Sequence, residues 1–465
     1  MGICRFYIPL YTLTLYLGCL PYLVLTQDQL NLHARLSAAH RILLNKYPYA
    51  EYLKFSQNFF YDLNPISLPH IGNDIGPLLL DLPVYIIKRN EGTGNLGNRM
   101  GEWLWYSGCR YAAGAHLILI PTPELVQEGL RYVKEPFYDN RVKATREIFA
   151  ESFPPFIINP NPARSAEEAK QKASSICGSL TSTWTRPLNL TLVIPFWRKL
   201  LGPIFHNITT TFFNSSLYTP VSFKLLNDSG INPEKLREGA MGGELISRPL
   251  RETDAVPMYP DVAIHYRCRD NVFFEHMGLL PFDVIVRRVP SDAKHVIIFT
   301  ENGNYPSKEN ELCADLVKIL YSKVVEKAPG ARVVLRSGFD VFFTYSILMH
   351  AQIVVCSAST FCFHAALPNS VGNVHFPVTQ FFYGTAGYNM FRKSNAATNP
   401  FPRFQMIEEV LPLSFDPKSN ITQSEIVHIL QNETLCIELY HQSPSVSRLR
   451  HEAYETFRWF YHMRR

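Results

Sequence analysis

Three polar side chains lie at the end of an apolar run in the string AIHYRCRDN, residues 263 to 271. The run has the pattern of a buried strand, so His265, Arg267 and Asp270 would lie at its carboxyl end. Ligands of open α/β sheets bind in the crevice outside the carboxyl ends of the strands. Because the planar guanidinium of Arg267 can hold a phosphate through two hydrogen bonds, the string predicts an anion site. The alternatives are a surface ion pair for Arg267 and a structural role for His265.

A glycine-rich turn is the second candidate. GTGNLG, residues 92 to 97, separates a β-rich run from a helical pattern and matches G-x-G-x-x-G, which makes Gly94 and Gly97 candidate ligand contacts. A dinucleotide fold also needs an acidic residue at the end of the next strand. HLILIPTPE has proline and threonine there, with Glu124 four residues past the strand. The pattern therefore disfavours a dehydrogenase, and glycines that serve only a tight turn remain an alternative.

Further polar side chains occur where strands are expected to end or helices to begin. Glu301 ends the strand pattern IIFTE, and a solvated loop charge is the alternative for it. Asp340 precedes a helical pattern and could cap that helix. The serine-rich turn before the helix STFCFHAAL can either cap it or bind phosphate, because hydroxyls and unpaired N–H groups meet there. Its candidate residues are Ser357, Ser359 and Thr360.

Strand and helix patterns alternate along much of the chain. A β-α-β unit is expected over residues 84 to 120, and a second α/β section starts near residue 258. The alternation predicts an α/β fold with a doubly wound parallel sheet. We expect one domain over residues 81 to 257, a second over 258 to 400 and a C-terminal extension over 401 to 465, while residues 180 to 255 show no clear organisation.

The N-terminus and the composition indicate a lumenal globular protein. Apolar residues make up 46% and charged residues 18% of the chain, and the net charge of +5 is dispersed, so no nucleic-acid partner is expected. Residues 6 to 25 carry no charge and, as a helix of about 30 Å, could cross a bilayer. We predict a signal-anchor over residues 1 to 26, with a cleaved signal peptide as the alternative. Residues 27 to 80 would form a stem that begins with an amphipathic helix, and the catalytic part would lie in the ER or Golgi lumen.

Downstream residues agree with that location. Six N-x-S/T triplets are candidate glycosylation sites, at Asn189, Asn207, Asn214, Asn227, Asn420 and Asn432. Seven cysteines follow the anchor, and in an oxidising lumen some of them should form disulfides. Because seven is odd, at least one stays free or bridges another chain. None of them has the spacing of a zinc site.

The motifs, in their order between about residues 84 and 385, resemble the α1,2-, α1,6- and protein O-fucosyltransferases. GNLGNR resembles the G-x-G-N-Q-like turn that enters their first helix, with Asn98 at the asparagine near donor and acceptor and Arg99 in place of the usual glutamine. AIHYRCRDN resembles their H-x-R-x-x-D motif, although Cys268 stands where the α1,2- and α1,6-enzymes have a second arginine. In the last motif, Phe363 and His364 replace the usual aromatic pair.

The resemblance implies a GT-B-like fold, in which two Rossmann-like domains, one for the acceptor and one for the GDP-sugar, face a cleft. Arg267 would bind the β-phosphate of GDP-fucose and Asp270 would order the site, while Asp340 would contact guanine or ribose. The expected partners are therefore a nucleotide sugar and a glycan or glycoprotein acceptor.

The implied reaction is transfer of fucose with inversion at the anomeric carbon. His265, Asp270 and Glu301 are candidates for the base that takes the acceptor proton. The sequence contains no Asp-x-Asp, the usual metal site of metal-dependent glycosyltransferases, so neither a metal nor another cofactor is expected. The alternatives are a catalytically silent sugar-binding protein of the same fold and a nucleotide-dependent oxidoreductase.

Overall fold

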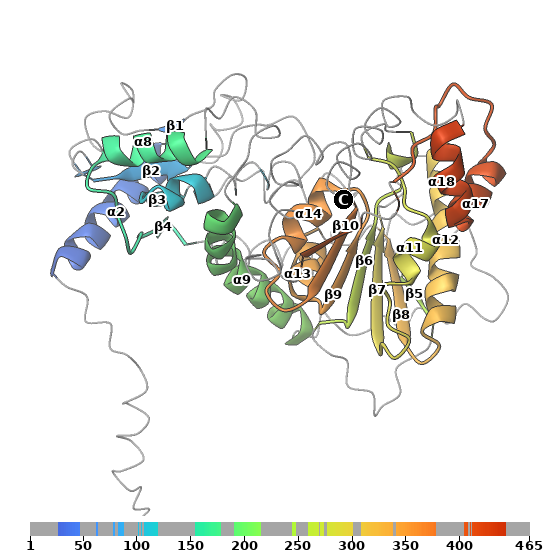
Figure 1. Cartoon of the computed structure of the whole chain (residues 1–465). Helices are drawn as coiled ribbons and strands as arrows, with labels where there is room; N and C mark the ends of the chain where they lie inside the picture. Colours follow the sequence, from blue (N-terminus) through green and yellow to red (C-terminus); the bar gives the residue numbers. More distant parts are fainter. Residues whose placement is uncertain are drawn as a thin grey trace, which may run out of the picture.

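A computed structural model places two sheets and the helices around them (Figure 1). It describes residues 27–46, 62–63, 78–79, 82–87, 101, 104, 107–119, 154–177, 190–214, 244–247, 259–268, 270–273, 277–300, 308–337, 341–377, 404–407, 410 and 412–442. The predicted anchor, residues 1 to 26, lies outside these ranges and stays a prediction. None of the described helices combines the length and the apolar character that a membrane span needs.

The larger sheet has the strand order β11-β10-β9-β6-β7-β8-β5. Its strands are β5 (Glu244–Ile246), β6 (Val262–Tyr266), β7 (His295–Thr300), β8 (Arg332–Ser337), β9 (Ile353–Cys356), β10 (Asn373–Pro377) and β11 (Phe404–Ile407). All run parallel except β5, which pairs antiparallel with β8. The chain passes from β6 through β7 to β8, returns to the other side of β6 as β9, and continues outward through β10 and β11. This is the 3-2-1-4-5-6 order of a Rossmann-like sheet, so the predicted α/β class with a parallel sheet is confirmed.

Side chains of the large sheet alternate between two apolar layers, one on each face. On β6, Ala263 belongs to the layer covered by α13 (Val341–His350) and α14 (Thr360–Ala366), whereas Ile264 belongs to the opposite layer. That opposite layer lies under α11 (Phe282–Val286), α12 (Lys308–Lys327) and α17 (Gln423–Gln431), with α18 (Glu433–Gln442) beside them. Because both faces are covered, the central strands are continuous apolar runs. β11, α17 and α18 come from the predicted C-terminal extension, which is thus built into the larger unit.

The smaller sheet has the order β1-β2-β3-β4. Its strands are β1 (Asp62–Leu63), β2 (Val84–Ile87), β3 (His116–Leu119) and β4 (Phe156–Ile157). β2 and β3 are parallel and the outer strands are antiparallel to them, so the described part of this sheet is mixed. Helical residues 107 to 112 connect β2 to β3, which confirms the predicted β-α-β unit. Gly114 follows this helix with φ of 88°, a left-handed conformation that favours glycine.

The helix predicted at the start of the stem is present as α2 (Gln27–Lys46), and it packs on the smaller sheet. Leu36 and Leu43 are buried against Ile118 of β3, and Arg35 Nε donates a hydrogen bond to the carbonyl of residue 78 at 2.7 Å. α8 (Ala166–Cys177) belongs to the same unit (Figure 1). The segment that begins the predicted stem therefore contributes to the folded core.

A long helix, α9 (Leu190–Asn214), joins the two units, in the region where the sequence showed no clear organisation. It contains Pro195 and Pro203, and proline inside a helix removes a backbone hydrogen bond at a cost of about 3 kcal/mol. Burial of its apolar face opposes that cost, and Phe205 stacks on Tyr345 of α13 at 4.6 Å between ring centroids. Toward the smaller sheet, Trp197 Nε1 donates a hydrogen bond to the Leu104 carbonyl at 2.7 Å. α9 therefore contacts both units through buried side chains.

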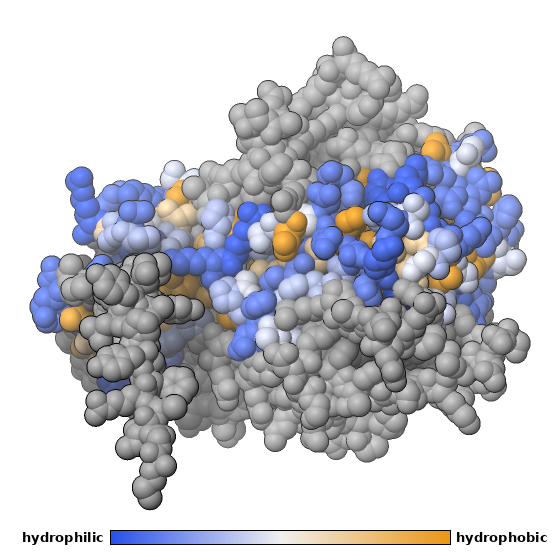
Figure 2. All heavy atoms as spheres, turned by 90° about the horizontal axis from the view of Figure 1, so that it is seen from below, coloured by the Kyte–Doolittle hydropathy of each residue, from blue (hydrophilic) through white to orange (hydrophobic). Residues whose placement is uncertain are grey.

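On the face shown in Figure 2, the described surface is mostly hydrophilic, and apolar residues are scattered rather than gathered. Apolar residues scattered singly are normal on a protein surface.

The hydrogen bond between Trp197 and the Leu104 carbonyl can be tested by substitution of Trp197. We expect Trp197→Phe to lower the free energy of unfolding by about 0.5–1.5 kcal/mol, because one hydrogen bond is lost while the Ser107 hydroxyl still donates to the same carbonyl and most of the ring packing stays. Trp197→Ala should cost about 3–5 kcal/mol because it also leaves a cavity. Urea unfolding measures both values, and equal losses for the two variants would contradict the assigned hydrogen bond.

Candidate functional site

The crevice of the larger sheet is set by its topology. The order in which the chain adds strands reverses at β6 and β9: β7 and β8 lie on one side of β6, and β9 to β11 lie on the other. The segments that follow the parallel neighbours β6 and β9 therefore leave toward opposite faces of the sheet. Ligands of Rossmann-like sheets bind at this switch point, outside the carboxyl ends. The segment after β6 carries Arg267 and the segment after β9 carries Ser357. The structure thus brings together two of the predicted site segments, although 90 residues separate them in the chain.

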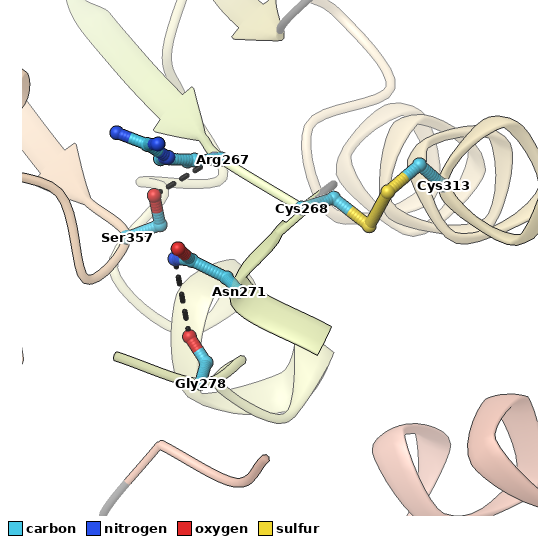
Figure 3. Close-up of a disulfide and its surroundings, with 6 residues drawn as sticks. All are labelled: Arg267, Cys268, Asn271, Gly278, Cys313 and Ser357. Atoms are coloured by element: carbon cyan, nitrogen blue, oxygen red, sulfur yellow. Dashed lines mark hydrogen bonds between the residues drawn. A yellow bond between two sulfur atoms is a disulfide. The ribbon is translucent and has the colours of Figure 1, made fainter. Parts of the chain in front are cut away.

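Two hydrogen bonds connect these segments directly. The Ser357 N–H donates to the His265 carbonyl at 2.8 Å, which extends the β6–β9 ladder by one step. The Arg267 N–H then donates to Ser357 Oγ, also at 2.8 Å. This bond involves the backbone of Arg267 and not its half-buried side chain. In Figure 3 the guanidinium extends from the end of β6 on the side of the Ser357 turn.

Asn271 supplies a third connection, and sequence reasoning did not single it out. It lies in η3 (Asp270–Val272), is fully buried, and its Nδ2 donates to the Ala358 carbonyl at 2.7 Å and to the Gly278 carbonyl at 3.4 Å. Its Oδ1 has no hydrogen-bond partner within the described part of the chain. Figure 3 shows the amide between the turn after β6 and the turn after β9. The sequence offered one signal for this residue, namely an asparagine four positions after Arg267.

Disulfides fix both turns. Cys268 is bonded to Cys313 of α12, with 5.6 Å between the Cα atoms, and in Figure 3 it leaves the strand on the side opposite to Arg267. Cys356 and Cys362 form a second disulfide that closes over the serine-rich turn. Cys268 therefore has a structural role here.

The remaining cysteines agree with the expectation from the sequence. Cys109 is also disulfide-bonded, and Cys436 is a buried free thiol. The expectation that some cysteines pair and at least one stays free is thus confirmed.

His265 lies on the same face of β6 as Ala263, beneath α14. It is 7% exposed, and its ring centroid is 5.4 Å from that of Phe361. Burial, with a further contribution from the positive charge of Arg267, lowers the pKa of His265 to about 3. A general base works best with a pKa near the operating pH. His265 is therefore poorly suited to the predicted role of general base, and the structure favours the alternative of a structural histidine.

The hydroxyls of the serine-rich turn are buried. Ser359 is the N-terminal cap residue of α14 with extended backbone, but its side chain makes no capping bond. Its Oγ has no hydrogen-bond partner among the described residues, and Thr360 beside it is also buried. The cap interpretation of Ser359 is thus wrong for its side chain. Since α14 has only seven residues, the site depends on the convergence of the two turns rather than on a helix dipole.

The smaller unit approaches α14 through the helix that follows the glycine-rich turn. Gly101 lies against His364, so closely that a Cβ at position 101 would overlap the imidazole ring. Leu104, one turn later, shares an apolar layer with Cys362 and Phe363 of α14. The chain segment that directly follows the predicted glycine turn therefore contacts the helix that directly follows the predicted serine turn.

Several predicted site residues lie outside the described residues, namely Gly94, Gly97, Asn98, Glu301 and Asp340. Asp270 is described only as the first residue of η3, without its side chain. Among the described side chains no group of three or more histidine, cysteine or acidic residues is arranged to hold a metal ion. The expected roles of these residues stay predictions.

No family model matches the chain, and neither the curated proteins nor the solved structures contain a significant match.

Asn271 provides a test of how the two turns are held. Asn271→Ala should lower the free energy of unfolding by about 1–3 kcal/mol, because it leaves the buried Ala358 carbonyl without a donor. Asn271→Asp should not restore it, since a carboxylate cannot donate to that carbonyl. The exposed Asn161→Ala is the matched control and should change stability by less than about 0.5 kcal/mol. A wild-type urea midpoint for Asn271→Ala would contradict the assigned role.

His265 gives a prediction on pH. Its pKa is lowered to about 3 in the native state, so the unfolded chain gains a proton below about pH 6.5 that the folded protein does not bind. The contribution of the neutral, buried ring to the free energy of unfolding is fully present above pH 6.5 and is lost as the pH falls from there toward 3. His265→Asn should therefore reduce the slope of unfolding free energy against pH, between pH 6 and 5, by about 1 kcal/mol per unit. An unchanged slope in guanidinium titrations would show that His265 is not buried as a neutral ring.

Proposed function

We propose that this chain is an inverting glycosyltransferase that transfers fucose from GDP-fucose to a glycan or glycoprotein acceptor in the secretory pathway. The observation that carries the proposal is the position of Arg267, at the switch point of a Rossmann-like sheet and bonded to the serine-rich turn of the neighbouring strand. The motif resemblance suggests the donor, and the described disulfides support an oxidising compartment. In this proposal the smaller unit is the acceptor-side domain of a GT-B-like enzyme.

The reaction breaks the bond between the anomeric carbon of fucose and the β-phosphate oxygen, and the electron pair stays on the departing GDP. The acceptor oxygen forms the new bond from the opposite face of the sugar, which inverts the anomeric centre. A guanidinium aimed in advance at the diphosphate stabilises the charge that develops there. Arg267 is fixed at its backbone by Ser357 and at the next residue by the disulfide, so little reorganisation is needed.

Other residues have supporting roles in this proposal. Ser357, Ser359 and Thr360 form the turn that faces the diphosphate, and Asp340 contacts guanine or ribose. The acceptor proton goes to Asp270 or Glu301, because the lowered pKa of His265 makes that ring a weak base. Neither a metal nor another cofactor takes part, as the missing Asp-x-Asp suggests.

Arg267 supplies the direct test. Arg267→Ala should lower the rate of GDP release from GDP-fucose by about 10²–10³, because the donor to the leaving group is lost. Arg267→Lys should recover only part of this, since an ammonium cannot form the two-point contact. Arg287→Ala, on the surface and paired with Glu433, is the control and should keep wild-type activity.

The assay supplies GDP-fucose with N-glycan, O-glycan or folded-domain acceptors and measures free GDP with and without EDTA. Binding of GDP-fucose without turnover on any acceptor would indicate the silent sugar-binding protein. NADP retained on purification would indicate the oxidoreductase. A requirement for UDP-sugars, or loss of the reaction in EDTA, would contradict the proposal.

A further inference from the structure

Two histidines and a tyrosine meet near the amino ends of β6 and β9, at the edge of the sheet opposite to the candidate site. His206 Nδ1 of α9 lies 2.7 Å from the hydroxyl of Tyr259, which belongs to the segment that enters β6. The ring of Tyr259 stacks on that of His350, the last residue of α13, with 4.9 Å between the centroids. The ring centroids of His206 and His350 lie 6.1 Å apart. These three side chains, the histidine cluster, therefore connect three segments of the chain.

His350 is a neutral ring that can gain one more proton. Its Nδ1 lies 2.9 Å from the Ser346 carbonyl, and because a carbonyl only accepts, Nδ1 carries the proton of the neutral ring. Burial lowers the pKa of His350, hydrogen bonds to the backbone of Ser346 and Gly202 raise it, and a charge on His206 lowers it further. The ring is therefore neutral at neutral pH, and acid adds a proton to Nε2.

The ionisable groups that face His350 come from α9 and from the segment before β6. His206 is exposed and its charge acts on His350, whereas burial raises the pKa of Tyr259, so the phenol stays neutral. Arg198, two turns earlier on α9, is directed to the carbonyls that follow α14. Asp261, two residues after Tyr259, accepts hydrogen bonds from backbone N–H groups at the start of β7. Within the described part of the chain, neither histidine of the cluster forms an ion pair with a carboxylate.

Protonation of both histidines would place two positive charges close together in this contact. Like charges repel, and the repulsion is stronger here than in bulk water because the neighbouring protein atoms exclude solvent. The hydrogen bond to Tyr259 survives protonation of His206, since the phenol oxygen can accept from Nδ1–H. The repulsion therefore acts against the apolar contact between the two helices, in which Phe205 and Ile208 share a layer with Ile347.

We propose that the histidine cluster is an acid-sensitive joint, which holds the second half of α9 on α13 when both rings are neutral and loosens this contact when both are protonated. Because α9 contacts both units through buried side chains, the joint makes the connection between the units dependent on pH. The inference goes beyond the proposed function and does not depend on the identity of any ligand.

Hydrogen exchange of the full-length protein, measured by mass spectrometry at about pH 7.5 and about pH 5, tests the inference after correction for intrinsic exchange rates. Peptides from the second half of α9 should lose protection on acidification by roughly 3- to 100-fold, the range that two unit charges at this distance produce between bulk water and a protein surface. Peptides from β7 and β8 report the general effect of acid on the fold and should lose less.

Substitution of either histidine by glutamine keeps a polar side chain that cannot become charged. Because the repulsion needs both charges, His206→Gln and His350→Gln should each abolish the extra loss in α9, and the double variant should behave like either single one. His206 is exposed, so its variant is expected to fold even if His350→Gln destabilises the protein. His428→Gln, at an exposed histidine of α17, is the matched control and should keep the wild-type response.

The outcomes separate this inference from the proposed function. Equal protection of α9 at both pH values in the wild-type protein would overturn the joint, and so would an undiminished loss in His206→Gln. Either result leaves the proposed function standing, because GDP release from GDP-fucose is measured separately. If that release is absent while acid loosens α9 in the wild-type protein but not in His206→Gln, the joint stands and the proposed function fails.

Discussion

The parallel pairing of β6 with β9 is the constraint on which the rest of the site depends. It places two turns at one edge of the sheet although the chain between them forms β7, β8 and their helices. Once the strands pair, the N–H groups of Arg267 and Ser357 complete the connection, Asn271 bridges to Ala358, and one disulfide fixes each turn. In the proposed function, this fixed backbone would present the Arg267 guanidinium to the diphosphate with little reorganisation, which is the condition for electrostatic catalysis.

The two units are connected by more than the chain between them. α9 and α14 share an apolar layer with the helix of the smaller sheet, so the smaller unit is positioned by burial as well as by single contacts. His364 lies where the two units meet, with its ring against Gly101. Mutations on α14 would therefore act on both units at once, while changes on α17 or α18 lie on the other face of the sheet.

Much of the fold was predictable because its signals are local. Apolar runs such as VAIHY, the alternation with helices and the β-α-β unit follow from patterns of a few residues. α9 was missed because Pro195 and Pro203 are breaking signals, which long-range burial outweighs. At the site, Arg267 and Ser357 were predicted as separate candidates and the structure brings them together, whereas the side chain of Ser359 makes no capping bond. The roles of Asn271, Cys268 and His364 depend on partners 45 or more residues away or on backbone approach, and no local pattern encodes them.

A crystal structure of the protein with GDP bound tests the central claim most directly. We expect the diphosphate outside the carboxyl ends of β6 and β9, with the Arg267 guanidinium within about 3 Å of a phosphate oxygen, the usual hydrogen-bond distance. Density for the nucleotide at the amino ends of the strands, or at this crevice with Arg267 directed away from the phosphates, would contradict the assignment of the site.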